Sequence, residues 1–273
     1  MPHVTVNGNE MHYRDTGGDG FPVVLAHGFT GNARNWALTV PALREQFRVV
    51  SPDHRGHGHS HKPLRQEDYE LERMAEDLYG LIQVLGIEEC YLAGHSMGGI
   101  VSQLLILEHP ELVRALVLVD TAAEVPQTLR AKERYEERQR LVRIAEEHGM
   151  GAVFDEQLKA ADPRIRENTV FVETWREQFL LTSREAYIYG AHGMASRRSV
   201  VGRLGEIRVP ALVICGQNDE PFLQPSRDIA AAIPGGELTI IAGAGHTPQI
   251  ETPAEFNRVL CGWLEKVQAG VKV

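Results

Sequence analysis

The stretch YLAGHSMGGI, Tyr91 to Ile100, places one serine among three glycines directly after a short apolar run. Within it, residues 94–98 match the pattern G-x-S-x-G, which sets a serine on a strained turn between a strand and a helix. The flanking sequence supplies both elements, since an apolar run precedes Ser96 and a helical pattern covers Met97 to Glu108. Small residues beside such a turn leave room for neighbouring segments. We therefore expect the glycines to expose Ser96 as a nucleophile.

Eight short apolar runs bounded by Gly, Pro or Asp are typical of strands. They are HVTVNG, MHYRD, PVVLAH, FRVVSP, CYLAG, RALVLVD, PALVICG and ELTIIAG. The first two flank Asn7-Gly8, a pair that favours a tight turn, and so predict a hairpin. The later six are almost continuously apolar, as buried parallel strands are, and helical patterns such as residues 70–85 lie between them. This alternation predicts an α/β fold with a mostly parallel eight-stranded sheet flanked by helices.

The closing helical pattern carries a start signal in ETPAEF, residues 251–256. Thr252 is a residue type that caps helices, and Pro253 suits the first helical position. Glu255 follows Thr252 at the spacing of a capping box, so we expect that box to form.

More than eighty residues between Asp120 and Ile207 contain no convincing strand pattern and predict an inserted helical unit. Residues 127–149 are strongly charged with a thin apolar seam, and residues 174–195 supply aromatic and apolar material for further helices. The charge run from Arg130 to Arg143 is interpreted as a solvated face.

Composition limits the classes of function. The chain has 273 residues, and its net charge of 28 − 37 = −9 argues against a broad surface for nucleic acid or anionic membrane. No segment approaches the ~18 apolar residues of a membrane span, and the N-terminus lacks a basic region followed by an apolar one. The three cysteines are far apart without CxxC spacing, which argues against disulfides and zinc. We expect a cytoplasmic protein, monomeric or homodimeric, with a small-molecule partner, no nucleic acid and no membrane.

Five motifs together resemble those of one family in order and spacing. They are AHGFTGNARNW, SPDHRGHGHSHKP, AGHSMGGIV, CGQNDEPF and GAGHTPQIETPAEF. Through them the chain resembles the α/β-hydrolase fold family, of the type with a helical cap. The resemblance covers nearly the whole length. The implied division is an α/β-hydrolase core at residues 1–123 and 202–273, with a helical cap inserted at 124–201.

The nucleophile needs a general base, and histidine is the side chain whose ordinary pKa suits that task near neutral pH. His246 follows the last strand-like run in a glycine-rich loop, where open parallel sheets place their sites. Asp219 matches the family's position for the acid that orients the imidazole, in the chain order Ser, Asp, His. Asp120 also ends a strand-like run and is the alternative acid.

The negative charge that develops beside Ser96 needs hydrogen-bond donors. The Met97 N–H lies at the predicted helix N-terminus and is one candidate. The resemblance implies the Phe29 N–H, in the HGFTG loop, as the second donor. Four aromatic residues are candidate linings of the substrate pocket: Phe29, Trp175, Phe179 and Tyr187. Arg197 and Arg198 are interpreted as a solvated basic pair, with a carboxylate clamp as the alternative.

Other polar residues have structural interpretations. Four histidines crowd the segment DHRGHGHSH, namely His54, His57, His59 and His61. Alternating histidines around glycines give no fixed ligand geometry, so we expect no metal and no cofactor. His27 and His95 are expected to pack beside the site, and Arg55 with Asp53 to support the neighbouring loop.

The sequence thus predicts a serine hydrolase that cleaves a carboxylic ester or lactone through an acyl-enzyme on Ser96. A serine nucleophile argues against the dehalogenase and epoxide-hydrolase chemistries, which use a carboxylate. Two alternatives stay open. One is enol-lactone hydrolysis or carbon–carbon bond cleavage on the same triad, although C–C hydrolases of the family often carry Asn where this chain has His95. The more distant one is a non-catalytic, ligand-sensing protein of the same fold.

Overall fold

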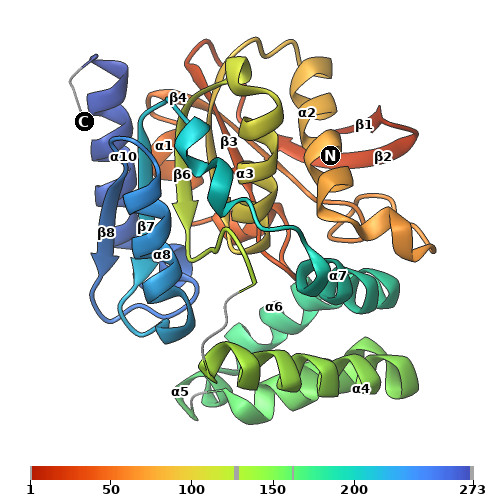
Figure 1. Ribbon diagram of the computed structural model, residues 1–273. Coiled ribbons are helices and arrows are strands. Elements are labelled where there is room, and N and C mark those ends of the chain that lie inside the picture. Colours follow the sequence, from red (N-terminus) through yellow and green to blue (C-terminus); the bar gives the residue numbers. More distant parts are fainter. Residues whose placement is uncertain (1, 126–128, 162, 271–273) are drawn as a thin grey trace.

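The computed structural model describes residues 2–125, 129–161 and 163–270. Eight strands form one sheet in the order β1-β2-β4-β3-β5-β6-β7-β8 (Figure 1). Their bounds are β1 His3–Val6, β2 Asn9–Asp15, β3 Phe21–Ala26, β4 Phe47–Pro52, β5 Cys90–His95, β6 Val113–Val119, β7 Ala211–Gly216 and β8 Glu237–Ile241. Strands β3 to β8 pair in parallel, whereas β1 and β2 pair antiparallel, and so do β2 and β4. The predicted fold class is confirmed.

The first two strands form the predicted hairpin. Asn7 and Gly8 both adopt positive φ, 51° and 76°, and Val6 pairs with Asn9 across the turn. Asparagine and glycine tolerate this left-handed conformation, which matches the twist of the two strands. The local sequence therefore determines the turn.

Helices cover both faces of the sheet. The helices outside the β6–β7 connection are α1 Val40–Leu43, α2 Leu71–Val84, α3 Met97–Glu108, α8 Glu220–Ala232, α9 Pro248–Glu251 and α10 Pro253–Gln268. Short 3-10 helices span Ala33–Trp36, Gln66–Tyr69, Pro110–Leu112 and Val201–Glu206. Val24 and Ala26 of β3 pack in the same core as α2, α3 and α8, whereas Val23 and Leu25 pack with α1 and α10. Because side chains alternate along a strand, this one strand supplies both cores.

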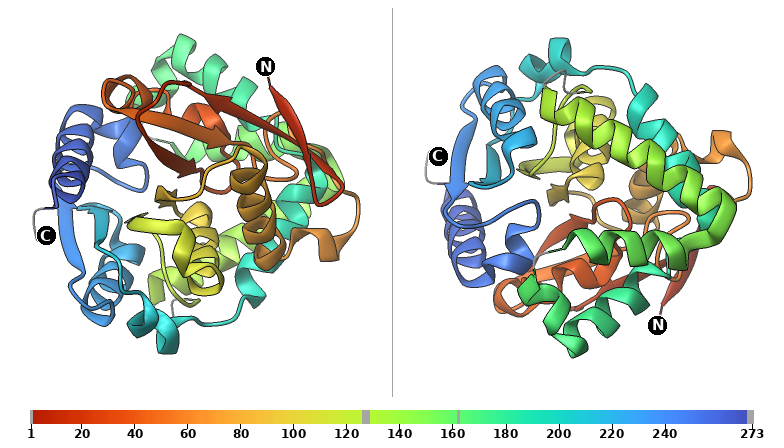
Figure 2. Two further views of the ribbon diagram at one scale, coloured as in Figure 1. Left: turned by 90° about the horizontal axis from the view of Figure 1, so that it is seen from above. Right: turned by 90° about the horizontal axis from the view of Figure 1, so that it is seen from below.

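The connection between β6 and β7 carries a helical insertion, α4 to α7. Its helices are α4 Leu129–Ala160, α5 Pro163–Glu167, α6 Thr169–Phe179 and α7 Arg184–Ser196. They lie below the sheet in Figure 1, on the side toward which β6 and β8 run, and Figure 2 (right) shows α4 crossing this side. The predicted helix over 127–149 continues to Ala160 across a break at Gly149, where φ is 78° and ψ is 178°, and residues 127–128 lie outside the described residues.

The insertion has a small core of its own, which includes Leu141, Ala145, Phe154, Phe179 and Tyr187. Its helices fall within the predicted range 124–201, and the division into core and cap at those boundaries stays a prediction. Among the described helices, none combines the length and apolarity that crossing a bilayer requires. The cytoplasmic location and the oligomeric state also stay predictions.

The capping box predicted at Thr252 is wrong. Helix α10 does begin at Pro253, but Thr252 makes no side-chain cap there. Its hydroxyl instead donates to the carbonyl of Pro248 at 3.2 Å, at the end of α9, where the Thr252 backbone N–H donates to the same carbonyl at 3.0 Å. The carboxylate of Glu255 accepts from Arg258, at 2.6 Å.

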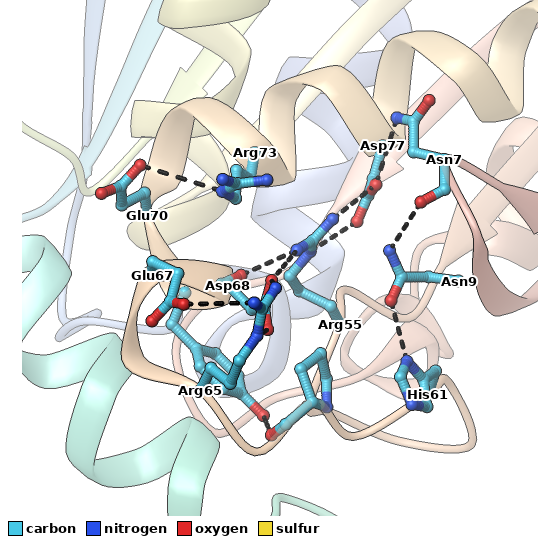
Figure 3. Close-up of polar contacts among 12 residues, drawn as sticks. Asn7, Asn9, Arg55, His61, Arg65, Glu67, Asp68, Glu70, Arg73 and Asp77 are labelled. Atoms are coloured by element: carbon cyan, nitrogen blue, oxygen red, sulfur yellow. Dashed lines mark hydrogen bonds and ion pairs between the residues drawn. The ribbon is translucent and has the colours of Figure 1, made fainter.

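Arg55 supports the loop after β4 as predicted, although its partner is Asp77 rather than Asp53 (Figure 3). Its Nε and Nη2 donate to the two oxygens of Asp77 at 2.7 and 2.8 Å, and its Nη1 donates to the carbonyl of Asp68. Asp53 accepts from the backbone N–H groups of Ala33 and His59. These bonds tie the loop to α2 and to the segment after β3.

Candidate active site

Ser96 occupies the turn between β5 and α3. Its φ is 51° and its ψ is −113°, a conformation that a non-glycine residue adopts only when the surroundings hold it. The Ser96 N–H donates to the carbonyl of Val119 at 2.8 Å, and the Thr121 hydroxyl donates to the carbonyl of Ser96 at 2.8 Å. The end of β6 thus fixes the strained turn from both sides.

The three glycines of the stretch have the steric role that the sequence predicts. A Cβ atom at Gly94 would lie 2.3 Å from the carbonyl oxygen of Gly98, and one at Gly98 would lie 2.4 Å from that of Ala26. A Cβ atom at Gly99 would lie 2.6 Å from the Cβ of Thr121. All three distances are too short for real contacts. The start of α3 can therefore approach β3 and β6 this closely only with glycine at these positions.

The structure brings Ser96, His246 and Asp219 together. Ser96 Oγ lies 3.0 Å from His246 Nε2, and His246 Nδ1 lies 2.6 Å from Asp219 Oδ2. Asp219 lies in the short loop after β7, at the position before the first residue of α8, and His246 lies in the loop between β8 and α9. Because an ionised carboxylate can only accept, Nδ1 carries the proton and Nε2 is left to accept from the Ser96 hydroxyl.

Electrostatics keeps the Asp219–His246 pair in this protonation state. Burial alone would raise the pKa of Asp219, but the hydrogen bond and charge of His246, with the charge of Arg134, lower it. Burial lowers the pKa of His246, against the opposing effect of Asp219. Near neutral pH, Asp219 is therefore ionised and His246 is an uncharged base.

His95, inside the turn, holds the loop that carries His246. Its Nε2 donates to the backbone carbonyl of His246 at 2.6 Å. Burial, followed by the neighbouring His246, lowers the pKa of His95 to about 3, so the ring is neutral and has a fixed tautomer. His27 has a comparable structural role, because its ring bonds the Gly28 carbonyl and the His54 N–H.

Asp120, the alternative acid, is buried next to Asp219, but no hydrogen bond joins it to the imidazole of His246 among the described residues. Its Oδ1 accepts from the Gly216 N–H at 2.9 Å, whereas its Oδ2 is buried without a hydrogen-bond partner among the described residues. Burial, and then the charge of Asp219, raise the pKa of Asp120 to about 8. A carboxyl with this pKa is protonated near neutral pH, so it can act as a donor toward the neighbouring Asp219. The ring of His246 bonds Asp219, so the geometry favours Asp219 as the orienting acid.

The two candidate oxyanion donors flank the serine. Met97 begins α3, and Phe29 lies in the loop after β3. Within the described ranges, neither backbone N–H has a hydrogen-bond acceptor. A Cβ atom at Gly28 would lie 3.2 Å from the Cβ of Ser96, so the loop carrying Phe29 is packed directly against the serine. Both N–H groups are available to bind negative charge beside Ser96.

A cavity of about 480 Å³ opens at Ser96 between the core and the insertion. The four predicted pocket residues, Phe29, Trp175, Phe179 and Tyr187, all line it. The rings of Phe29 and Tyr187 stack, with centroids 5.2 Å apart, which joins the oxyanion loop to α7. A second, smaller active-site cavity of about 100 Å³ also reaches Ser96.

The charge run of α4 is not wholly a solvated face. Arg134 and Arg138 line both cavities beside Ser96, a position that the sequence analysis missed. Arg197 lines only the smaller cavity and donates to the carbonyls of Met194 and Glu124, whereas Arg198 is exposed. The alternative of a clamp formed by Arg197 and Arg198 is therefore not supported, whereas the exposure of Arg198 agrees with the favoured interpretation for that residue.

The crowded histidines do not converge on one point. Among the described residues, the only cluster of three or more potential metal ligands is Asp120, Asp219 and His246, whose ligand atoms lie within 4.8 Å of one another. A third cavity, of about 780 Å³, lies away from Ser96, around Arg55. Some of its charged groups are paired, for example Arg65 with Asp68 (Figure 3).

Comparison with known proteins gives a consistent result. A family model described as alpha/beta hydrolase fold matches residues 22–253. The chain is 31% identical over 261 residues to RutD of Serratia proteamaculans (strain 568), named as a candidate carbamate hydrolase, covering 90% of this chain and 91% of that one. The enol-lactonase from Burkholderia xenovorans LB400 has a TM-score of 0.86 at 30% identity, and the match covers 97% of this chain and 100% of that one. The malate-bound thermophilic esterase from Thermogutta terrifontis has a TM-score of 0.84 at 30% identity, and the match covers 98% of this chain and 99% of that one.

Proposed function

The chain belongs to the α/β-hydrolase fold family, and we propose that it hydrolyses a carboxylic ester or lactone through an acyl-enzyme on Ser96. The observation that carries the proposal is the continuous hydrogen-bond chain from Ser96 Oγ through His246 to Asp219. A hydroxyl bonded to an uncharged imidazole, which is itself oriented by a carboxylate, is an activated nucleophile.

In the first half of the reaction, Ser96 Oγ attacks the substrate carbonyl carbon while His246 Nε2 takes its proton. The negative charge that forms on the carbonyl oxygen is bound by the N–H groups of Phe29 and Met97. Asp219 stabilises the imidazolium and keeps its orientation. His246 then gives the proton to the departing alcohol oxygen, the carbon–oxygen bond breaks, and the acyl group stays on Ser96.

In the second half, His246 takes a proton from water, and the resulting hydroxide attacks the acyl carbon. The second tetrahedral intermediate uses the same two N–H groups. It collapses with return of the proton to Ser96 Oγ, which frees the carboxylic acid. No step requires a cofactor.

The insertion acts in this proposal as the cap that shapes the substrate site. Trp175, Phe179 and Tyr187 come from α6 and α7 and form the apolar wall of the larger cavity. Such a wall excludes water and selects the acyl or alcohol group, while the chemistry stays on the sheet. Enol-lactone hydrolysis is the second candidate, supported by the similarity to the Burkholderia enol-lactonase.

The test is turnover of a simple aryl ester by the purified protein, followed in parallel with Ser96→Ala. We expect multiple turnovers per protein and a fall of at least ~10³-fold in the variant, because the base then has no nucleophile to activate. Thermal unfolding of both proteins serves as the control, since Ser96→Ala removes only one hydroxyl. Comparable activity in the variant would refute the mechanism. Stoichiometric ligand binding without turnover would support the sensing alternative instead.

A further inference from the structure

We propose that Arg134 and Arg138 form a carboxylate-binding subsite, so that the preferred ester or lactone carries a carboxylate of its own. The inference rests on the proposed function and names its substrate class. The two arginines are four residues apart on α4 and so share one face of the helix. Together with Ser96, they are the only residues common to the linings of both active-site cavities among the described residues. A group held by them lies beside the scissile bond.

Arg138 has no carboxylate partner among the described residues. Its guanidinium lies 5.2 Å from the centroid of the Phe29 ring, and its Nη1 is 3.7 Å from the Sδ of Met194. An aromatic face and a thioether are weak partners for a cation. Arg138 is half-buried and faces both cavities, and a partly desolvated cation without an opposite charge is unfavourable, so an anion bound there would complete the site.

Arg134 has capacity for a second anion contact. Its Nη1 is 3.6 Å from Asp219 Oδ1, which is an ion pair at a distance too long for a good hydrogen bond. Its side chain is 36% exposed, and its guanidinium lies 5.2 Å from the centroid of the Phe222 ring. The remaining N–H groups of Arg134 can therefore reach a ligand in either cavity.

Arginines on the outer side of the insertion are paired differently. Arg140 donates to Glu137 and Glu156 at 2.8 to 2.9 Å, and Arg176 donates to Asp155 at 2.6 Å. Glu137 also lines the larger cavity, but its carboxylate is occupied by Arg140. Arg134 and Arg138, which face Ser96, have no carboxylate within hydrogen-bond distance among the described residues.

The charge of the subsite persists near neutral pH. Burial and then the charge of Arg134 lower the pKa of Arg138 to about 10, and burial lowers that of Arg134. Both guanidinium groups are therefore positive at pH 7, within a protein whose net charge is −9. Planar guanidinium groups bind carboxylates through paired hydrogen bonds, which a simple point charge does not provide.

The experiment compares esters that differ only in a terminal carboxylate. One pair places it on the acyl chain: the 4-nitrophenyl monoester of adipic acid against 4-nitrophenyl hexanoate. The other places it on the leaving group: 4-carboxyphenyl against 4-methylphenyl butanoate. We expect a higher kcat/KM for the anionic member of at least one pair. Arg138→Met should lower that preference ~10- to 100-fold, the effect of losing a charged hydrogen bond.

Arg143→Met is the matched control, because Arg143 is exposed on the same helix and lines neither cavity. It should leave the preference unchanged. Arg138→Lys should restore part of it, since lysine keeps the charge but loses the paired geometry. Binding of adipate to Ser96→Ala, measured by calorimetry, gives a readout independent of turnover and should weaken in the double variant with Arg138→Met.

The outcomes separate the two proposals. If the wild type turns over neither neutral nor anionic esters, the proposed function fails. If it turns over neutral esters but prefers the anionic member of neither pair, the subsite is refuted. Equal loss on both members in Arg138→Met, with adipate binding unchanged, would also refute it.

Discussion

Replacing each of the two adjacent aspartates with asparagine separates their roles. Asp219→Asn puts an amide where His246 Nδ1 now donates at 2.6 Å. An amide N–H facing that nitrogen favours the imidazole tautomer with its proton on Nε2, which cannot accept from Ser96. We expect kcat to fall by up to ~10⁴ with the shape of the site retained.

Asp120→Asn, in contrast, should change catalysis little. The protonated Asp120 accepts from the Gly216 N–H and presents a donor next to Asp219, and an asparagine can do both. We expect kcat within ~10-fold of wild type, well short of the tautomer effect.

The stability of the Asp120→Asn variant should depend less on pH. In the folded protein the pKa of Asp120 is raised to about 8, above its unfolded value, so the folded state holds a proton that the unfolded state releases. The contribution of this proton to the free energy of unfolding is fully present below the pKa that Asp120 has in the unfolded chain. It is lost as pH rises toward 8, by at most ~1.4 kcal/mol per pH unit. Asparagine has no such proton to lose.

The assays are kcat on a 4-nitrophenyl ester and urea unfolding, both from pH 5 to 9. A refuting result is specific: Asp120→Asn loses catalysis ~10³-fold with its fold retained, while Asp219→Asn stays active. In that case His246 would take its orientation from Asp120, and the assignment made from the bond lengths would be wrong.

Three further predictions follow from the site. For a neutral ester, kcat/KM should fall on the acid side with an apparent pKa below 6.5, because burial lowers the pKa of His246 and its protonated form cannot accept from Ser96; an apparent pKa of 7 or above would contradict this. EDTA should leave activity unchanged, since each step is assigned to a protein group; reversible loss on chelation would point to the cluster around Asp120. Trp175→Ala should alter the ratio of kcat/KM between long and short acyl esters, and equal change for all lengths would argue against its place in the pocket wall.

The sheet could be predicted because each strand is marked locally. Apolar runs of strand length end at glycine, proline or aspartate, and the alternation with helices permits few other arrangements. Helix α3 has the predicted bounds, Met97 to Glu108, because it begins directly after the turn at Ser96 and Pro110 follows its end. The capping box at Thr252 failed because the preceding helix, α9, was not foreseen and competes for the same hydroxyl.

The three candidate catalytic residues could be predicted from the positions at which the parallel strands end. Ser96, Asp219 and His246 each follow the carboxyl end of a parallel strand, and those ends meet at one edge of the sheet. The arginines of α4 could not be found in this way, since periodicity shows which residues share a face but not what that face contacts. A signal was nevertheless present. Stepping three or four residues from the buried Leu141 and Ala145 leads to Arg138 and Arg134 on the same face.

The charges around His246 connect this arginine face to the chemistry. Burial is the main cause of the lowered pKa of His246, and Arg134 and Arg138 lower it further, whereas Asp219 raises it. In the free protein, burial and the two arginines together keep the base uncharged. A substrate carboxylate bound to them would cancel part of their effect, so His246 would become a stronger base once that substrate is in place. A neutral substrate would leave the base at its weaker value. The two cations would then select the anionic substrate, and the carboxylate of that substrate would raise the basicity of His246.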